Sequence, residues 1–378
     1  MNKIKSTISS TLTPNKIMKN LFLAIGLVLS ISQAFGQIRI MNSGSKEPIP
    51  IELSEVHEMV KNLADSIQVN YIFAEKASML KENLLKELKN RKFDHINEKN
   101  DLAKHLSNLL VTWSNDGHFL ILKAEPAGER LVMPSSYNHL AKYNYAFEKL
   151  EHLNGNIAYL KFNRFIPPAY TGSLISSSML FAANSDALII DLRDNIGGSP
   201  ETVGLLAGFF LKEPTLLSIN YTRATDSKEE IWSSEADIKI NSSNPDNFII
   251  PTGALERLKN IPVYILTSKR TFSAAEMFSS SLQGYDRVKT VGENTGGGGH
   301  GINPYEIVQG FTAYIPMANY YHPLTEESWE VVGVKPDIPC TETDAKRIAQ
   351  ITILKELQEK PNHDTKINDY LKELEINK

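Results

Sequence analysis

Two short and almost wholly apolar segments constrain the fold of this 378-residue chain most strongly. They are residues 187–192 (ALIIDL) and 261–267 (IPVYILT). Apolar runs of this length between turn signals are typical of buried strands. Helical spacing follows each of them, at 201–211 and from Ser273 onward. Because strand and helix alternate from Asn156 onward, the sequence predicts a mixed α/β domain.

The first third of the chain has a different pattern. Residues 51–68, 74–88 and 100–113 each place their apolar side chains on one helical face. Asn97 and Asn100 are the predicted caps of the third helix. We therefore expect a small N-terminal helical domain that precedes the α/β domain.

The remaining segments complete the predicted organisation. Further strands are expected at 119–122, 157–162, 216–224, 230–240, 288–292, 307–317 and 329–337, and further helices at 174–183, 344–360 and 364–376. The expected domains are a signal region (1–36), the helical domain (37–123), a connecting segment (124–155), the α/β domain (156–340) and C-terminal helices (341–378).

Composition excludes several functional classes. Apolar residues at 42% and charged residues at 22% are ordinary for a globular protein, and a net charge of −4 offers no basic surface for nucleic acid. Cys340 is the single cysteine, so neither an intrachain disulfide framework nor a cysteine metal cluster is expected. His57-Glu58 lacks the second histidine of a metalloprotease helix motif. We expect no metal and no cofactor.

The N-terminus has the features of an export signal. A short basic start precedes the apolar run Leu21–Ser32, and Ala34-Phe-Gly36 supplies small residues for a signal peptidase. The apolar run is short for a bilayer about 30 Å thick. We expect export with cleavage near Gly36/Gln37 and no stable membrane anchor.

Ser273 stands between a predicted buried strand and a predicted helix. Such a turn lifts a hydroxyl out of the sheet, and the N-terminus of the helix offers free N–H groups for an oxyanion. The same position suits a helix cap, with Glu276 completing a capping box. From this segment alone, both readings stay open.

Three other segments carry candidate site residues. His118 follows an Asp-Gly turn, and Gly197-Gly198 lies in a strand-to-helix loop whose N–H groups could bind an anion. His300 ends the glycine run 296–299, which we expect to form a flexible loop, and Glu330 stands beside a tryptophan. Taken alone, the Asp-Gly-His segment is better explained as a structural turn and Glu330 as a solvent-facing strand residue, whereas the loop at Gly197-Gly198 fits a tight turn as well as an anion site.

Taken together in order, four motifs resemble the C-terminal processing (tail-specific) peptidase family of serine proteases. They are ALIIDLRDNIGG at 187–198, TSKRTFSAAE at 267–276, VGENTGG at 291–297 and GVKPDI at 333–338. The resemblance implies a crotonase/ClpP-like ββα spiral. It also implies that Ser273 is the nucleophile and that the N–H groups of Ala274 and of Gly197 or Gly198 form the oxyanion hole.

One departure from this family bears on the mechanism. Bacterial members carry a catalytic lysine at the position that Gly298 occupies here. The chain is instead similar to the branch of the tricorn core protease and interphotoreceptor retinoid-binding protein. That resemblance implies His118 as the general base and Glu330 as the carboxylate that orients it. His300 remains an alternative base or a substrate contact.

The resulting hypothesis is an exported serine endopeptidase that acts on peptides or unfolded proteins through an acyl-enzyme. An alternative is a non-catalytic protein that binds a hydrophobic ligand or peptide on the same fold. A third is a serine hydrolase that acts on esters. The sequence leaves the oligomeric state open.

Overall fold

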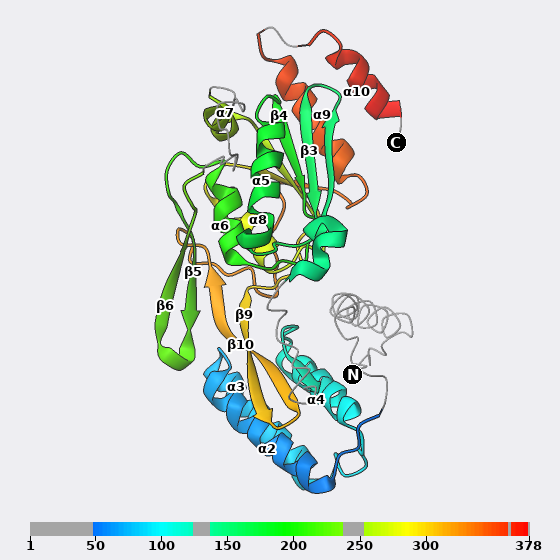
Figure 1. Ribbon diagram of the computed structural model, residues 1–378, viewed down its shortest axis with the longest axis vertical. Helices are drawn as coiled ribbons and strands as arrows, with labels where there is room; N and C mark the ends of the chain where they lie inside the picture. The colour runs from blue at the N-terminus through cyan, green and yellow to red at the C-terminus, as the bar shows by residue number, and fades with distance from the viewer. Residues whose placement is uncertain (1–47, 124–136, 237–252, 362–363, 377–378) are drawn as a thin grey trace, which may run out of the picture. The chain divides into compact units, whose positions relative to one another are not determined.

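The computed structural model describes residues 48–123, 137–236, 253–361 and 364–376 (Figure 1). Every element described below lies in one compact unit, Ile49–Lys378. The predicted signal region, 1–36, lies outside the described residues. No helix within the described ranges is both long enough and apolar enough to cross a bilayer.

The predicted N-terminal helices are present as α2 (Leu53–Asn70), α3 (Ala74–Lys89) and α4 (Lys99–Ser114). Their apolar faces share one hydrophobic cluster with strands β9 (His300–Val308) and β10 (Phe311–Tyr321). The long β9–β10 hairpin thus gives the helices the apolar surface that they need to fold.

The predicted cap of α4 is wrong. The helix begins after Glu98, whose carboxylate accepts a hydrogen bond from the Asp101 N–H at 2.8 Å. Asn100 lies inside the first turn, and its side chain donates to that same carboxylate. An acceptor that reaches the third N–H satisfies the helix start, and a carboxylate can provide it as well as an amide can.

A six-stranded sheet forms the centre of the α/β part, in the order β11-β8-β7-β4-β3-β2 (Figure 1). All neighbouring strands are parallel except the antiparallel pair β2–β3. The strands are β2 (Phe147–Leu153), β3 (Ile157–Phe162), β4 (Ala187–Asp191), β7 (Val263–Thr267), β8 (Lys289–Gly292) and β11 (Ile338–Pro339).

Alternate residues of the central strands enter two different cores. Leu188 and Ile190 of β4 pack in the core that includes helices α5 to α8, whereas Ile189 packs in the core that includes α9 and α10. Because successive side chains of a strand point to opposite faces, the sheet is covered on both sides. The helices are α5 (Pro168–Ala182), α6 (Pro200–Gly208), α7 (Ala254–Asn260), α8 (Ala274–Gly284), α9 (Ala345–Gln358) and α10 (Ile367–Ile376).

A second, antiparallel sheet links the helical part to the α/β part. Its order is β1-β10-β5-β6, and β9 also pairs with β10. The remaining bounds are β1 (Leu120–Lys123), β5 (Leu216–Thr222), β6 (Ser227–Trp232), η2 (Tyr137–Ala146) and η3 (Arg223–Thr225). The turn before β1 and the start of β9 supply the two candidate histidines.

Several predicted elements differ from the structure. Residues 329–337 form a turn rather than a strand, because Val331 and Gly333 have φ angles of 66° and 71°, which an extended strand does not allow. The expected strand 307–317 is the hairpin β9–β10, which turns at Gly310. His300 therefore begins a strand and does not lie in a loop. Strand β2, in the predicted connecting segment, was missed.

Loss of one side chain should test the core of the N-terminal helices. Phe119 is fully buried and packs against Tyr71, with ring centroids 4.8 Å apart. We expect Phe119→Ala to lower the free energy of unfolding by about 3–5 kcal/mol in urea titrations, because it leaves a cavity. Phe181→Ala, at a side chain that is 42% exposed, is the matched control and should cost less than about 1 kcal/mol. Equal losses would contradict this account of the core.

Candidate active site

Ser273 occupies a strained turn between β7 and α8. It is the N-cap residue of α8, with φ 55° and ψ −121°, a conformation that non-glycine residues rarely adopt. Its N–H donates to Oε2 of Glu276 at 2.8 Å, and Ser273 is only partly buried. The residue is thus a helix cap by position, and the turn also holds it in the strained geometry that a nucleophile at a strand–helix junction requires.

Glu276 fixes this turn to the neighbouring glycine loop. Its buried carboxylate accepts from the Ser273 N–H and the Thr295 hydroxyl, and from the N–H groups of Gly297 and Gly298, at 2.5–2.8 Å. Burial raises the pKa of Glu276 to about 7, while these four donors favour its ionised form. These four hydrogen bonds to one carboxylate therefore fix Ser273 and the 295–298 loop relative to each other.

The predicted oxyanion donors lie around this turn. Gly197 packs so closely that a Cβ there would lie 2.7 Å from the Ala274 nitrogen and 2.7 Å from the Ser273 Cβ. The Gly197 N–H donates to Oδ1 of Asn195 at 2.9 Å. Within the described residues, the N–H groups of Gly198 and Ala274 have no protein acceptor. These two N–H groups can therefore bind an oxyanion, whereas that of Gly197 is already engaged.

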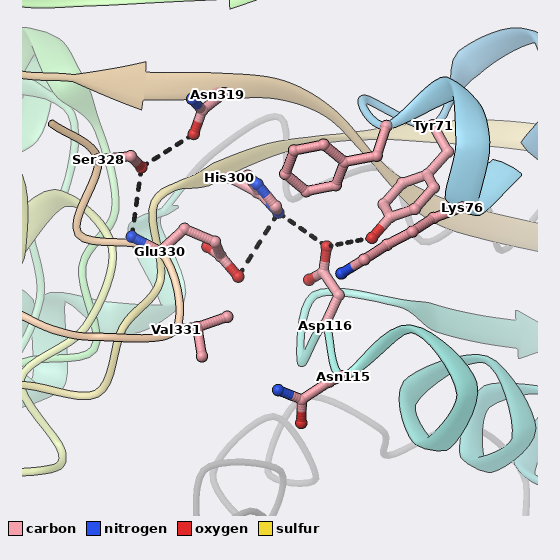
Figure 2. A pocket seen from close by; sticks show the side chains of 10 residues that line it. Tyr71, Lys76, Asn115, Asp116, His300, Asn319, Ser328, Glu330 and Val331 are labelled. Atoms are coloured by element: carbon pink, nitrogen blue, oxygen red, sulfur yellow. Dashed lines mark hydrogen bonds and ion pairs between the residues drawn. The ribbon is translucent and has the colours of Figure 1, made fainter. Parts of the chain in front are cut away.

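Both candidate histidines converge on one carboxylate, that of Asp116, in the turn between α4 and β1. Its Oδ1 lies 3.1 Å from Nδ1 of His118, and its Oδ2 lies 2.7 Å from Nδ1 of His300 at the start of β9. The hydroxyl of Tyr71 donates to the same Oδ2 at 3.2 Å (Figure 2). Asp116 therefore anchors the two rings from separate parts of the chain.

Glu330 completes this cluster from the turn after β10. Its Oε1 lies 3.5 Å from Nδ1 of His300, and its Oε2 lies 3.9 Å from Nδ1 of His118. The Gly299 N–H donates to Oε2 at 2.6 Å. Glu330 is thus close enough to act on both imidazoles by charge, but the carboxylate that hydrogen-bonds His118 is Asp116.

Burial and charge shift the pKa values of the side chains in this cluster. Burial acts to lower the pKa of His118, but the hydrogen bond and charge of Asp116, with help from Glu330 and Glu276, raise it above its usual value. Burial acts to raise the pKa of Asp116, yet the hydrogen bonds from the two imidazoles hold it well below its usual range. Burial raises the pKa of Glu330. The site therefore favours an imidazolium at His118.

The second ring nitrogen of each histidine has no hydrogen-bond partner among the described residues. Nε2 of His118 and Nε2 of His300 are buried without a hydrogen bond among the described residues, so neither ring is bonded to Ser273. The His118 ring packs 5.1 Å from the ring of Phe272, the residue before the serine, whereas the His300 ring packs 5.3 Å from Phe73 of the helical part. Of the two, His118 is the one whose ring contacts the serine turn.

The ring of Phe272 lies against Gly298, the position at which the family resemblance implies a lysine. A Cβ at Gly298 would lie 2.4 Å from Cζ of the Phe272 ring. A lysine at this position would have to displace that ring. The Phe272 ring therefore occupies the space that a side chain at position 298 would need.

A cavity of about 250 Å³ opens beside the cluster (Figure 2). Its lining includes Asp116, His300 and Glu330, but not Ser273. The complete lining is Tyr71, Phe73, Lys76, Asn115, Asp116, His300, Asn319, Ser328, Glu330 and Val331.

Sequence reasoning missed two members of the site. Asp116 stands two residues before His118 in the Asp-Gly-His turn, and this short spacing could have identified it as the partner of the imidazole. Tyr71, at the end of α2, carries no comparable signal, because only the tertiary packing of the helices and β9 in one apolar cluster brings it to Asp116.

The contact between Phe272 and position 298 can be tested by stability. We expect Gly298→Ala to lower the free energy of unfolding by about 1–3 kcal/mol because the new methyl group meets the Phe272 ring. In the Phe272→Ala background the same change should cost clearly less, a coupling that a double-mutant cycle measures.

Gly172→Ala is the control for this cycle, because nothing lies within 4 Å of a Cβ there and the residue is helical. It should cause no loss of stability. Additive effects of the two changes at Phe272 and Gly298 would show that the ring does not fill this space.

Two family descriptions match consecutive parts of the chain. "Peptidase family S41" matches residues 156–340, and the "N-terminal domain of Peptidase_S41 in eukaryotic IRBP" matches residues 50–153. The four motifs that suggested this resemblance all lie within the first match.

Curated relatives agree with these matches. A carboxyl-terminal-processing protease of Picosynechococcus is 26% identical over 195 residues, which cover 51% of this chain and 42% of that protein. The chloroplastic carboxyl-terminal-processing peptidase 1 of Arabidopsis thaliana is 22% identical over 245 residues, which cover 63% and 46%. The chain thus spans less than half the length of these relatives.

The fold also has a counterpart among solved structures. A lipoprotein from Streptococcus agalactiae superimposes with a TM-score of 0.53 at 15% sequence identity, covering 83% of this chain and all of that one. At this identity the similarity concerns the fold, which includes both the helical and the α/β parts.

Proposed function

The chain belongs to peptidase family S41, and we propose that it is an exported serine endopeptidase with histidine as the general base. The observation that carries this proposal is the pair formed by Asp116 and His118. The carboxylate engages Nδ1 of the ring, and Nε2 remains free on the imidazole that contacts the serine turn. This is the arrangement that a base for Ser273 requires.

The proposed reaction begins with proton transfer from Ser273 to His118. The Ser273 oxygen attacks a peptide carbonyl, and the N–H groups of Ala274 and Gly198 bind the oxyanion. The imidazolium then protonates the leaving amine, and water releases the acyl-enzyme. Because no hydrogen bond joins serine and histidine without substrate, the proposal requires that Nε2 of His118 and the Ser273 oxygen come within hydrogen-bond reach as substrate binds.

The two carboxylates take different parts in this scheme. Asp116 is the positioning residue, since it fixes Nδ1–H of His118 and so leaves Nε2 able to accept a proton. Glu330, 3.9 Å from the same nitrogen, stabilises the imidazolium by charge. His300 lines the cavity and is proposed to contact the substrate.

Substrate and location follow from the relatives and the leader-like sequence. The relatives are named for carboxyl-terminal processing, so peptides or unfolded proteins are the proposed substrates. The basic and apolar segment that ends at Gly36 supports export, with the mature chain beginning near Gln37.

Removal of the proposed nucleophile is the direct test. Ser273→Ala should reduce kcat/KM on an unfolded protein substrate by at least about a thousandfold, because no other group forms the acyl-enzyme. Its unfolding midpoint should stay near that of the parent chain. Ser280→Ala, on the same helix, is the matched control and should retain activity.

The same variants separate this proposal from a binding protein. A fluorophosphonate should label the parent chain at Ser273 and leave Ser273→Ala unlabelled. Full activity of Ser273→Ala would refute the assignment. If the probe never reacts and no substrate is cleaved, a protein that binds a hydrophobic ligand or peptide is the better description.

The pH profile tests the role of Asp116. Since His118 has to be neutral to accept a proton and its pKa is raised, kcat/KM should increase with pH along a limb centred above about 6.5. Asp116→Asn should move this limb to lower pH and reduce the plateau by about a hundredfold or more, because it removes the charge and the orienting acceptor.

Glu330→Gln should move the limb in the same direction by a smaller amount, since Glu330 acts on His118 through charge alone. A limb that stays in place in Asp116→Asn would contradict the assignment of His118 and Asp116 as the working pair.

A further inference from the structure

We propose that Asp116, His118, His300 and Glu330 form a binding site for one zinc-class divalent ion, and that this ion switches off the peptidase. The first half concerns binding and stands alone. The second half rests on the proposed function, because it concerns the base that His118 provides.

The four side chains bring a set of candidate metal ligands together. Each offers one ligand atom, and these atoms all lie within 4.8 Å of one another. The four imidazole–carboxylate separations are 2.7, 3.1, 3.5 and 3.9 Å. Bonds to zinc of about 2.0–2.1 Å place tetrahedral ligands about 3.3–3.4 Å apart. Because the ligand atoms lie up to 4.8 Å from one another, the most distant pair has to approach by up to about 1.5 Å to bind the ion.

Both rings direct the same atom, Nδ1, toward the carboxylates, although they come from distant parts of the chain. The side chains of His118 and His300 are 7% and 1% exposed, and those of Asp116 and Glu330 are 3% and 10% exposed. A ring nitrogen has to be unprotonated to bind a metal, and with both imidazoles neutral the four side chains carry a net charge of −2, which a divalent cation neutralises. Burial of this charge strengthens the attraction.

The surroundings support the ligand atoms as they do in metal sites. The hydroxyl of Tyr71 donates to Asp116 (Figure 2). The Gly299 N–H donates to Glu330, so each carboxylate is oriented by a second contact. The 250 Å³ cavity is lined by three of the four ligands and gives an ion a route of entry.

The donor set selects the kind of ion. Two imidazole nitrogens with two carboxylate oxygens suit Zn²⁺, whereas Mg²⁺ and Ca²⁺ prefer six or more oxygen ligands. Cys340 does not belong to the cluster, so no thiolate favours a softer ion.

Ion binding and proton acceptance exclude each other at His118. A metal on Nδ1 displaces the ring hydrogen, and the neutral ring then carries its hydrogen on Nε2. Nε2 is the nitrogen that the proposed mechanism needs as an acceptor. The bound ion also takes Asp116 away from its positioning role. Zinc should therefore inhibit, and a chelator should restore activity.

Calorimetry of the metal-stripped full chain with Zn²⁺ alone is the test. We expect one ion per chain with a dissociation constant in the micromolar range or below, and no comparable binding of Mg²⁺. His300→Gln and Glu330→Gln should each weaken this binding by at least about tenfold, because each removes one ligand.

Two further variants serve as controls for the binding measurement. Ser273→Ala should bind Zn²⁺ as the parent does, since its hydroxyl is not a ligand. His57→Gln removes a histidine that pairs with Asp94 at 3.2 Å outside the cluster and should also leave the binding unchanged. Circular dichroism of each variant establishes that it is folded.

The outcomes separate the two proposals. Absence of Zn²⁺ binding below about 100 μM, or unchanged binding in both His300→Gln and Glu330→Gln, overturns the metal site. Binding without inhibition of an active peptidase overturns the switch alone. Binding to a chain that never cleaves a substrate leaves the metal site standing and counts against the proposed peptidase.

Discussion

The hydrogen bonds of the Asp116 carboxylate are the interaction on which the site depends. One carboxylate engages two imidazoles and a tyrosine hydroxyl, and these groups come from the helical part and from strand β9. Because the carboxylate is buried, these contacts are needed to keep it charged. Its charge in turn raises the pKa of His118 and leaves Nε2 as the free nitrogen.

The scaffold explains why the N-terminal helices are part of the chemistry. The β9–β10 hairpin pairs with β5 at one end and packs under α2 at the other. The hairpin thereby carries His300 to Asp116, while Glu276 holds Ser273 and the glycine loop in place. The serine turn thus lies near two buried carboxylates, Glu276 on the α/β side and Asp116 on the helical side.

The sequence predicted most of the α/β part, because apolar runs and helical spacing are local signals. It also located the Ser273 turn and the glycine loop at 197–198. The turn at 329–337 was not predictable, because the apolar residues around Val331 read as a strand and only the positive φ angles show otherwise. Tyr71 was missed for a similar reason, since its role arises from tertiary packing alone.

The departure at Gly298 shows how local and tertiary information combine. The sequence has a glycine where the family resemblance implies a lysine. The structure shows that the Phe272 ring lies against this position and against the His118 ring. The Phe272 ring thus occupies the space between Gly298 and the His118 ring.

The most direct measurement is the distance between Nε2 of His118 and Oγ of Ser273 in a crystal structure of the chain bound to a peptide aldehyde. The account predicts a separation of about 3 Å, with Nδ1 of His118 still hydrogen-bonded to Asp116. An adduct in which His118 stays out of reach and another group contacts the serine oxygen would contradict it.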